Sequence, residues 1–78
     1  MNILIYSDDK KQNIVGIICY SKKDDDVNFE VYKASDNGLK HLDLIGNHIY
    51  NQIVDQTLID KFIEGYVTEY FNGCYYEK

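Results

Sequence analysis

Two histidines are the side chains of this sequence best suited to acid–base chemistry near neutral pH. They are His41 and His48, and Asp43 lies two residues after His41. On a β-strand this spacing places His41 and Asp43 on one face, where the carboxylate could orient the imidazole as a general base. The sequence around the pair has no nucleophile or metal motif at a recognisable spacing. We therefore interpret both histidines as surface residues and expect a protein that is not an enzyme.

The two cysteines, Cys19 and Cys74, are far apart in the sequence and form no paired metal-binding motif. Structural zinc sites usually draw on pairs such as Cys-x₂-Cys, so Cys74 together with the two histidines would make a poor zinc site. A glycine-rich phosphate loop is also missing from the sequence. We therefore predict no catalytic residues, no metal and no cofactor. Cys19 lies in an apolar run and is expected to be a reduced core residue.

The charged residues favour a protein partner over nucleic acid. Eight lysines, no arginine and thirteen acids give a net charge of −5. Arginine makes the bidentate phosphate contacts that lysine lacks, so we expect no direct binding of nucleic acid. The aspartate runs at 8–9 and 24–26 adjoin lysine pairs, and residues 1–34 carry a net charge of −1 while residues 35–78 carry −4. The acidity that would attract a basic surface therefore lies in the second half.

Short apolar runs between polar turns predict an antiparallel β-meander in the first half. Residues 2–7 and 14–21 are rich in β-forming side chains. Gly16 indicates a bulge or a close approach of another backbone. In residues 27–34 apolar and polar side chains alternate, which is typical of a strand with one buried and one wet face, and Tyr32 belongs to the wet face.

The middle of the chain allows two interpretations. Asn37-Gly38 favours a hairpin turn, after which residues 39–45 and 48–54 are predicted to be two strands joined by a tight turn at Gly46-Asn47. The alternative is a helix, since apolar residues recur at helical spacing, and Gly46 inside it would cost about 1 kcal/mol relative to alanine. We favour the strands. The predicted fold is then a single α+β domain over residues 1–78, with three to five antiparallel strands packed against one C-terminal helix.

The most regular pattern lies near the C-terminus and predicts an amphipathic helix over about residues 58–71. Its apolar stripe consists of Leu58, Ile59, Phe62, Ile63, Tyr66, Val67, Tyr70 and Phe71. Thr57 and Asp60 form a variant capping box, and Asn72-Gly73 provides a left-handed stop. The stripe is expected to pack on the sheet, and residues 74–78 are expected to return as a short edge segment.

Acids and tyrosines of the chain suggest where a partner would bind. The helix presents about one acidic charge per 7 Å, given the helical rise, which is sparse beside the roughly 1.7 Å of duplex DNA but sufficient to steer a basic surface. Eight of the eleven aromatic residues are tyrosines, a residue enriched in binding hot spots, although a coding sequence rich in A and T would also explain them. On the polar side of the helix, a glycine could admit a close partner. The candidate partner-binding residues are Asp60, Glu64, Gly65, Glu69, Tyr32, Tyr75, Tyr76 and Glu77.

Three segments carry a resemblance to a known class of proteins: MNILIYSDD, KKDDD and TLIDKFIEGYVTEYFNG. In general character, over its whole length, the chain resembles the small acidic inhibitors encoded by phages and mobile elements, anti-CRISPR proteins among them. The resemblance implies an inhibitor or adaptor that blocks a basic nucleic-acid-binding surface of a host nuclease complex. It transfers no functional residues.

The sequence also allows an alternative function and a homodimer, and it predicts a cellular location. The chain could instead be a self-assembling structural or accessory protein of a phage or mobile element. Its small size also leaves a homodimer open, because a short chain buries little surface alone. The sequence contains neither a basic n-region nor an apolar run of about 20 residues, so we expect no membrane segment and a cytoplasmic location.

Overall fold

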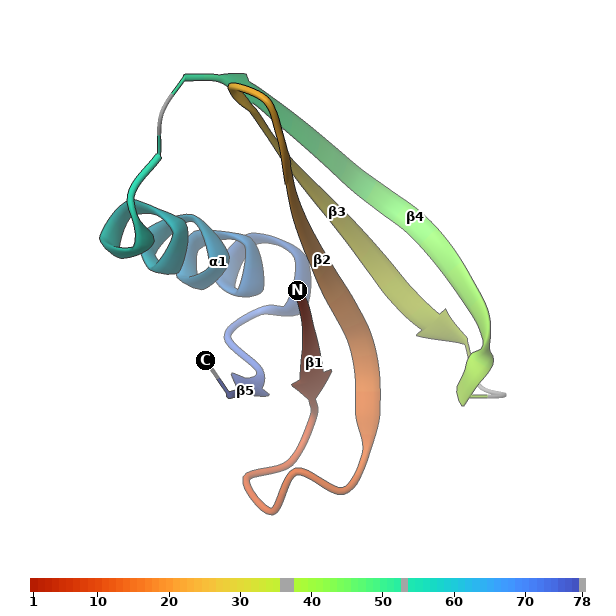
Figure 1. Cartoon of the computed structure of the whole chain (residues 1–78). Helices are drawn as coiled ribbons and strands as arrows, with labels where there is room; N and C mark the ends of the chain where they lie inside the picture. The colour runs from red at the N-terminus through yellow and green to blue at the C-terminus, as the bar shows by residue number, and fades with distance from the viewer. Residues whose placement is uncertain (36–37, 53, 78) are drawn as a thin grey trace.

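The computed structural model describes residues 1–35, 38–52 and 54–77, apart from the side chains of residues 38 and 39. Its strands form one five-stranded antiparallel sheet in the order β4-β3-β2-β1-β5, and one helix lies across a face of that sheet (Figure 1). The elements are β1 (Asn2–Tyr6), β2 (Ile14–Lys23), β3 (Asp26–Ser35), β4 (Gly38–Asn51), α1 (Gln56–Phe71) and β5 (Tyr75–Tyr76). The predicted α+β architecture, a meander against a C-terminal helix, is confirmed.

The first three strands follow the predicted meander, and their alternation decides which face is buried. Ile3, Ile18 and Val31 lie side by side across β1, β2 and β3, and all three are buried under α1. Successive side chains of a strand point to opposite faces. Their neighbours therefore lie on the face away from α1, which we call the outer face.

Gly16 on β2 lies where the end of α1 meets the sheet. A Cβ at this position would overlap the ring of Phe71 and lie 2.6 Å from the carbonyl oxygen of Tyr32. Beside it the register between β1 and β2 shifts, which leaves Val15 as an extra residue of a bulge. The two features predicted from this glycine, a bulge and a close approach, therefore both occur.

The predicted turn at Gly46-Asn47 is wrong, and so is the alternative helix. β4 runs without a break from Gly38 to Asn51. It pairs with β3 from Leu42 to Asn51 and again at Gly38, with register shifts at two places. Gly46 has another role, since a Cβ there would lie 2.6 Å from the hydroxyl oxygen of Tyr70. The glycine marks close packing of the helix on a strand, and not a change of chain direction.

A bulge takes the place of that turn. The register between β3 and β4 shifts between Val31 and Tyr32, and Ile45 becomes the extra residue of β4. A bulge of this kind bends and twists a strand without ending it. In Figure 1 the lower ends of β3 and β4 diverge from β1 and β2. The predicted strand end at Val54 is wrong, because β4 ends at Asn51. Residues 36–37 of the predicted turn and residue 53 of the predicted strand lie outside the described residues.

Of the two ends of α1, only the N-terminal end differs from the prediction. Asp55 is the N-cap, and its side chain accepts a hydrogen bond of 2.8 Å from the backbone N–H of Leu58. The predicted cap at Thr57 is therefore wrong: an aspartate two residues earlier provides a charged acceptor for the positive end of the helix. At the other end Asn72 adopts the left-handed conformation as predicted. The chain then returns as β5, which pairs with β1 and confirms the expected edge segment.

The core lies between α1 and the sheet and is centred on Phe29. This side chain is 0% exposed, and its ring centroid lies 5.3–6.1 Å from four other aromatic rings, those of Tyr20, Tyr50, Phe62 and Tyr66. The predicted stripe of the helix supplies its side of the core through Ile59, Ile63, Tyr66, Val67 and Phe71. Leu58 departs from the stripe and is exposed.

Candidate protein-binding surfaces

The eight candidate partner-binding residues lie on three separate surfaces. Four of them are on α1: Asp60, Glu64, Gly65 and Glu69. Three are at or beside β5, on the edge of the sheet: Tyr75, Tyr76 and Glu77. Tyr32 is alone on β3, on the outer face of the sheet. The fold therefore offers distinct surfaces and does not gather the eight residues into one site.

The acidic surface of α1 surrounds a shallow depression of about 530 Å³, which we call the Gly65 depression. It is lined by Lys61, Glu64, Gly65, Thr68 and Glu69. Glu64 and Glu69 are exposed, and neither makes a salt bridge within the described part of the chain, where the ion pair is Lys11 with Glu77. Two carboxylates of this surface are thus free to meet cations of another molecule.

Gly65 itself has no packing role among the described residues. A Cβ at this position would meet no heavy atom within 4 Å. Glycine inside a helix is about 1 kcal/mol less favourable than alanine, so the helix carries a destabilising residue on its exposed side. This contrasts with Gly16 and Gly46, where aromatic side chains occupy the space of the missing Cβ.

The β5 surface is partly occupied by internal contacts. Tyr76 is half-buried and packs against the core, and the Glu77 carboxylate forms a 2.9 Å ion pair with the ammonium group of Lys11. Tyr75 is different, because 48% of it is exposed. Of the two tyrosines, Tyr75 offers more surface to a partner.

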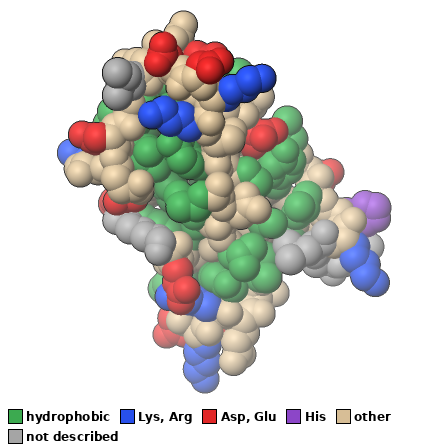
Figure 2. Space-filling model, viewed as in Figure 1, with side chains coloured by type: hydrophobic (Ala, Val, Ile, Leu, Met, Phe, Trp, Pro, Cys, Tyr) green, Lys and Arg blue, Asp and Glu red, His purple; other side chains and the backbone are tan. Residues whose placement is uncertain are grey.

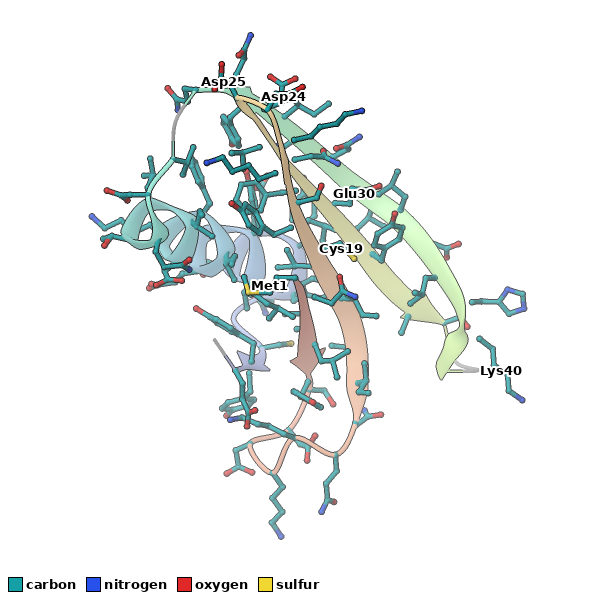
Figure 3. All side chains as sticks on the ribbon, viewed as in Figure 1. Met1, Cys19, Asp24, Asp25, Glu30 and Lys40 are labelled. Carbon is teal, nitrogen blue, oxygen red and sulfur yellow. The ribbon has the colours of Figure 1, made fainter. Side chains whose placement is uncertain are left out.

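Tyr32 is half-buried on the outer face, although the alternation predicted a wet face there. Its hydroxyl donates a 2.8 Å hydrogen bond to the Glu30 carboxylate, and this bond raises the pKa of Tyr32. Cys19, opposite Glu30 on β2, is a half-buried residue of the outer face, so its predicted place in the core is wrong. Figure 3 shows Cys19 and Glu30 near each other on the neighbouring strands β2 and β3. Burial first, and then the Glu30 charge, raise the pKa of Cys19 and favour its protonated thiol.

The histidines occupy different environments, which corrects their joint interpretation as surface residues. His41 is exposed on β4, as is Asp43. His48 is half-buried, with its Nε2 atom 2.7 Å from the Tyr70 hydroxyl and its ring stacked on Tyr66 at 4.5 Å. The uninterrupted course of β4 turns His48 toward α1, which the periodicity of the apolar residues does not indicate.

In residues 1–35, 38–52 and 54–77, no three His, Cys, Asp or Glu side chains gather in a group that could hold a metal ion. Over the same ranges, no helix has both the length and the apolar character required to cross a membrane.

The pH dependence of folding stability tests how Tyr66 of α1 packs against β4. Burial, and then a 2.6 Å hydrogen bond between the Tyr66 and Tyr50 hydroxyls, raise the pKa of Tyr66 above the ordinary value of 10.0. The folded state therefore keeps the neutral phenol while the unfolded chain ionises. Stability from this group is complete below pH 10 and is expected to fall above it, by up to about 1.4 kcal/mol per pH unit.

Chemical denaturation at a series of alkaline pH values measures this slope. Tyr66→Phe is expected to flatten it, and Tyr75→Phe, which removes an exposed phenol, is the control. An unchanged slope in Tyr66→Phe would contradict the buried hydroxyl pair.

Comparison of the chain with protein-family models, with curated proteins and with solved structures gave no match. An assignment of function therefore depends on the surfaces of the molecule.

Proposed function

We propose that this protein is a small acidic inhibitor or adaptor that binds a basic protein surface through the exposed side of α1. The observation that carries the proposal is the Gly65 depression, where two exposed carboxylates flank a glycine against which nothing packs. Neither carboxylate forms a salt bridge with any residue that the structure describes. A partner side chain or backbone that enters the depression meets no Cβ at Gly65. Its cations meet Glu64 and Glu69.

Charge supports this surface over the others. Residues 56–71 contain three acids and one lysine, whereas the aspartate runs at 8–9 and 24–26 lie beside lysines. An acidic field attracts a basic partner over several ångströms and raises its association rate. Surfaces that bind nucleic acid are basic by necessity, because they contact phosphates. A nucleic-acid enzyme is therefore the partner class that this charge fits best.

The resemblance to small inhibitors of phages and mobile elements supports a more specific version of the proposal. In this version the chain is anti-CRISPR-like and blocks the nucleic-acid-binding surface of a host nuclease complex in the cytoplasm. Such an inhibitor acts by occupancy, so it requires no catalytic residue, metal or cofactor of its own. It also requires no direct contact with nucleic acid.

Charge reversal on α1 tests the proposal. The double variant Glu64→Lys with Glu69→Lys is expected to lose at least tenfold in affinity for the partner captured from a host lysate, because it removes both carboxylates at the depression. Binding by the unchanged chain should also weaken between low and moderate salt, since exposed charges are screened. The measurement is a pull-down with mass spectrometry, followed by a salt titration of the affinity for the captured protein.

The matched control moves the same number of charges elsewhere. Asp9→Lys with Asp25→Lys changes the net charge equally, and both aspartates are exposed in the polar turns. This control should retain most of the affinity. Equal losses in the two double variants, or an affinity indifferent to salt, would contradict binding through α1.

Gly65→Ala separates binding from folding within the same experiment. The alanine is expected to stabilise the helix, by up to about 1 kcal/mol, because its Cβ meets no atom of the chain. Under the proposal the more stable variant binds the partner less well. A variant that is stabilised and binds equally well would remove Gly65 from the interface.

A further inference from the structure

The outer face of the sheet carries a row of apolar side chains that α1 does not cover. Leu4 pairs with Ile17, Ile17 with Tyr32, and Tyr32 with Leu44, so one residue from each of β1, β2, β3 and β4 stands in the row. Leu4, Ile17 and Tyr32 each lie one position along their strand from a residue buried under α1, so alternation directs them to the outer face. Leu44 lies on the same face because it pairs directly with Tyr32. The row crosses four neighbouring strands of the sheet.

Exposure is greatest where the row reaches β4. Leu44 is 53% exposed and Ile49 is 64% exposed, and both pair with outer-face residues of β3. Leu42, opposite Ala34, is a third exposed apolar residue of this region. Apolar side chains clustered in this way on a small chain indicate an interaction surface, whereas isolated ones do not.

This face is also poor in charge. We consider the outer-face residues of β3 between Asn28 and Ala34, together with their partners on β2 and β4. Among these residues the one charged side chain is Glu30. Its carboxylate already accepts the hydrogen bond from Tyr32. Figure 2 shows hydrophobic side chains gathered over the middle of the molecule, with most charged groups toward its extremities. The net charge of −5 is therefore concentrated away from the outer face.

We propose that the outer face binds the outer face of a second copy of this chain, in a two-fold sheet-on-sheet dimer. The same patch then serves both subunits, as in most homodimers. Packed sheets lie about 10 Å apart, with the side chains of their inner faces interdigitated. Leu44 and Ile49, exposed in the single chain, become part of that shared core.

The size of the molecule fits this arrangement. The two longer Cα extents of the whole chain, 36 and 23 Å, enclose about 830 Å², so the molecule has room for the ~800 Å² per partner of a standard interface only if most of one face is buried. The helix stripe does not offer the same opportunity, because it is already buried against the sheet of its own chain.

Charge distinguishes a second copy from another partner. Two chains of net charge −5 repel each other, so they associate most readily where each presents the fewest acids. The outer face meets that condition, whereas the acidic side of α1 favours a basic protein. The dimer leaves α1 exposed on both outer sides and is independent of the function proposed above.

Light scattering coupled to size-exclusion chromatography tests the dimer on the full chain over a concentration series. The unchanged protein is expected to approach twice the mass of its 9.2 kDa chain. Leu44→Gln with Ile49→Gln is expected to return the mass to that of one chain. Both side chains are exposed in the single chain, so circular dichroism should show that the double variant still folds.

The control removes two exposed apolar side chains elsewhere: Leu58→Gln on α1 with Tyr75→Gln on β5. It should dimerise as the unchanged chain does. Added salt should strengthen the dimer by screening the repulsion, which is opposite to its effect on an acidic–basic complex.

Two results would overturn the inference. One is the mass of a single chain at every concentration of the unchanged protein. The other is a dimer that persists in Leu44→Gln with Ile49→Gln, which would move self-association to another surface, such as the free edge of β4.

Discussion

Replacement of Phe29 by alanine is expected to lower the free energy of unfolding by about 3–5 kcal/mol, the usual loss for a large core aromatic. Phe29 is 0% exposed and its ring adjoins four other rings, from β2, β4 and α1. The alanine leaves a cavity between the helix and the sheet that these rings can fill only in part. Small domains have stabilities near the lower end of the 5–15 kcal/mol range, so a large part of the variant should be unfolded at room temperature.

Urea denaturation followed by far-ultraviolet circular dichroism measures this loss. Tyr75→Ala is the matched control, because it truncates an aromatic residue that is 48% exposed at the edge of the sheet. We expect the control to lose less than about 1 kcal/mol, as surface changes usually do. Similar losses in the two variants would show that the core is not centred on Phe29.

Gly16→Ala is expected to destabilise the fold by about 1–3 kcal/mol, the usual penalty for overpacking. The new methyl group would overlap the Phe71 ring and lie 2.6 Å from the Tyr32 carbonyl oxygen. One of these neighbours is the last residue of α1, and the other is backbone of the sheet. The end of the helix must therefore move, although alanine lowers the entropy of the unfolded chain and would stabilise an unobstructed site.

A double-mutant cycle identifies the obstruction. Phe71→Leu should cost less in the Gly16→Ala background than in the unchanged chain, since the smaller side chain relieves the overlap. Gly65→Ala is the control of opposite sign, because its Cβ would meet no atom within 4 Å. Additive effects of Gly16→Ala and Phe71→Leu would contradict the contact between β2 and the end of the helix.

The contact at Gly16 also connects packing to the proposed interface. Phe71 anchors the end of α1 on the sheet, and Glu69 lies two residues before it. A shift of this end would displace part of the Gly65 depression. Core variants should therefore be checked for fold before any change in partner binding is assigned to the interface.

Local patterns were sufficient to identify the first three strands and α1, but not the single strand β4. The period of the apolar residues identified α1, the left-handed stop at Asn72 identified its end, and alternation identified the buried side of β3. These features depend on residues within a few positions of one another. Hydrophobic periodicity and capping chemistry report such local preferences directly.

Contacts between distant residues decided what local patterns could not. Gly46 has the local signature of a turn, but the Tyr70 side chain, 24 positions later, fills the space above it and the strand continues. His48 looks like a surface residue until the same strand places it between Tyr66 and Tyr70. The N-cap of α1 is a local exception: the Asp55 carboxylate, two residues before the expected Thr57 hydroxyl, accepts the hydrogen bond from the Leu58 N–H.

The candidate surfaces divide in the same way. The acids of the second half and the exposed side of α1 follow from composition and helical period alone, and the structure places them around a depression that includes Gly65. The outer face could not be predicted, because its row assembles one residue from each of four strands whose register is set by backbone pairing and by two bulges. Local patterns in the sequence are enough to predict β1, β2, β3, α1 and the sign of the charge, but not β4. The tertiary structure alone decided which side chains meet, because that depends on register and on packing between residues distant in the chain.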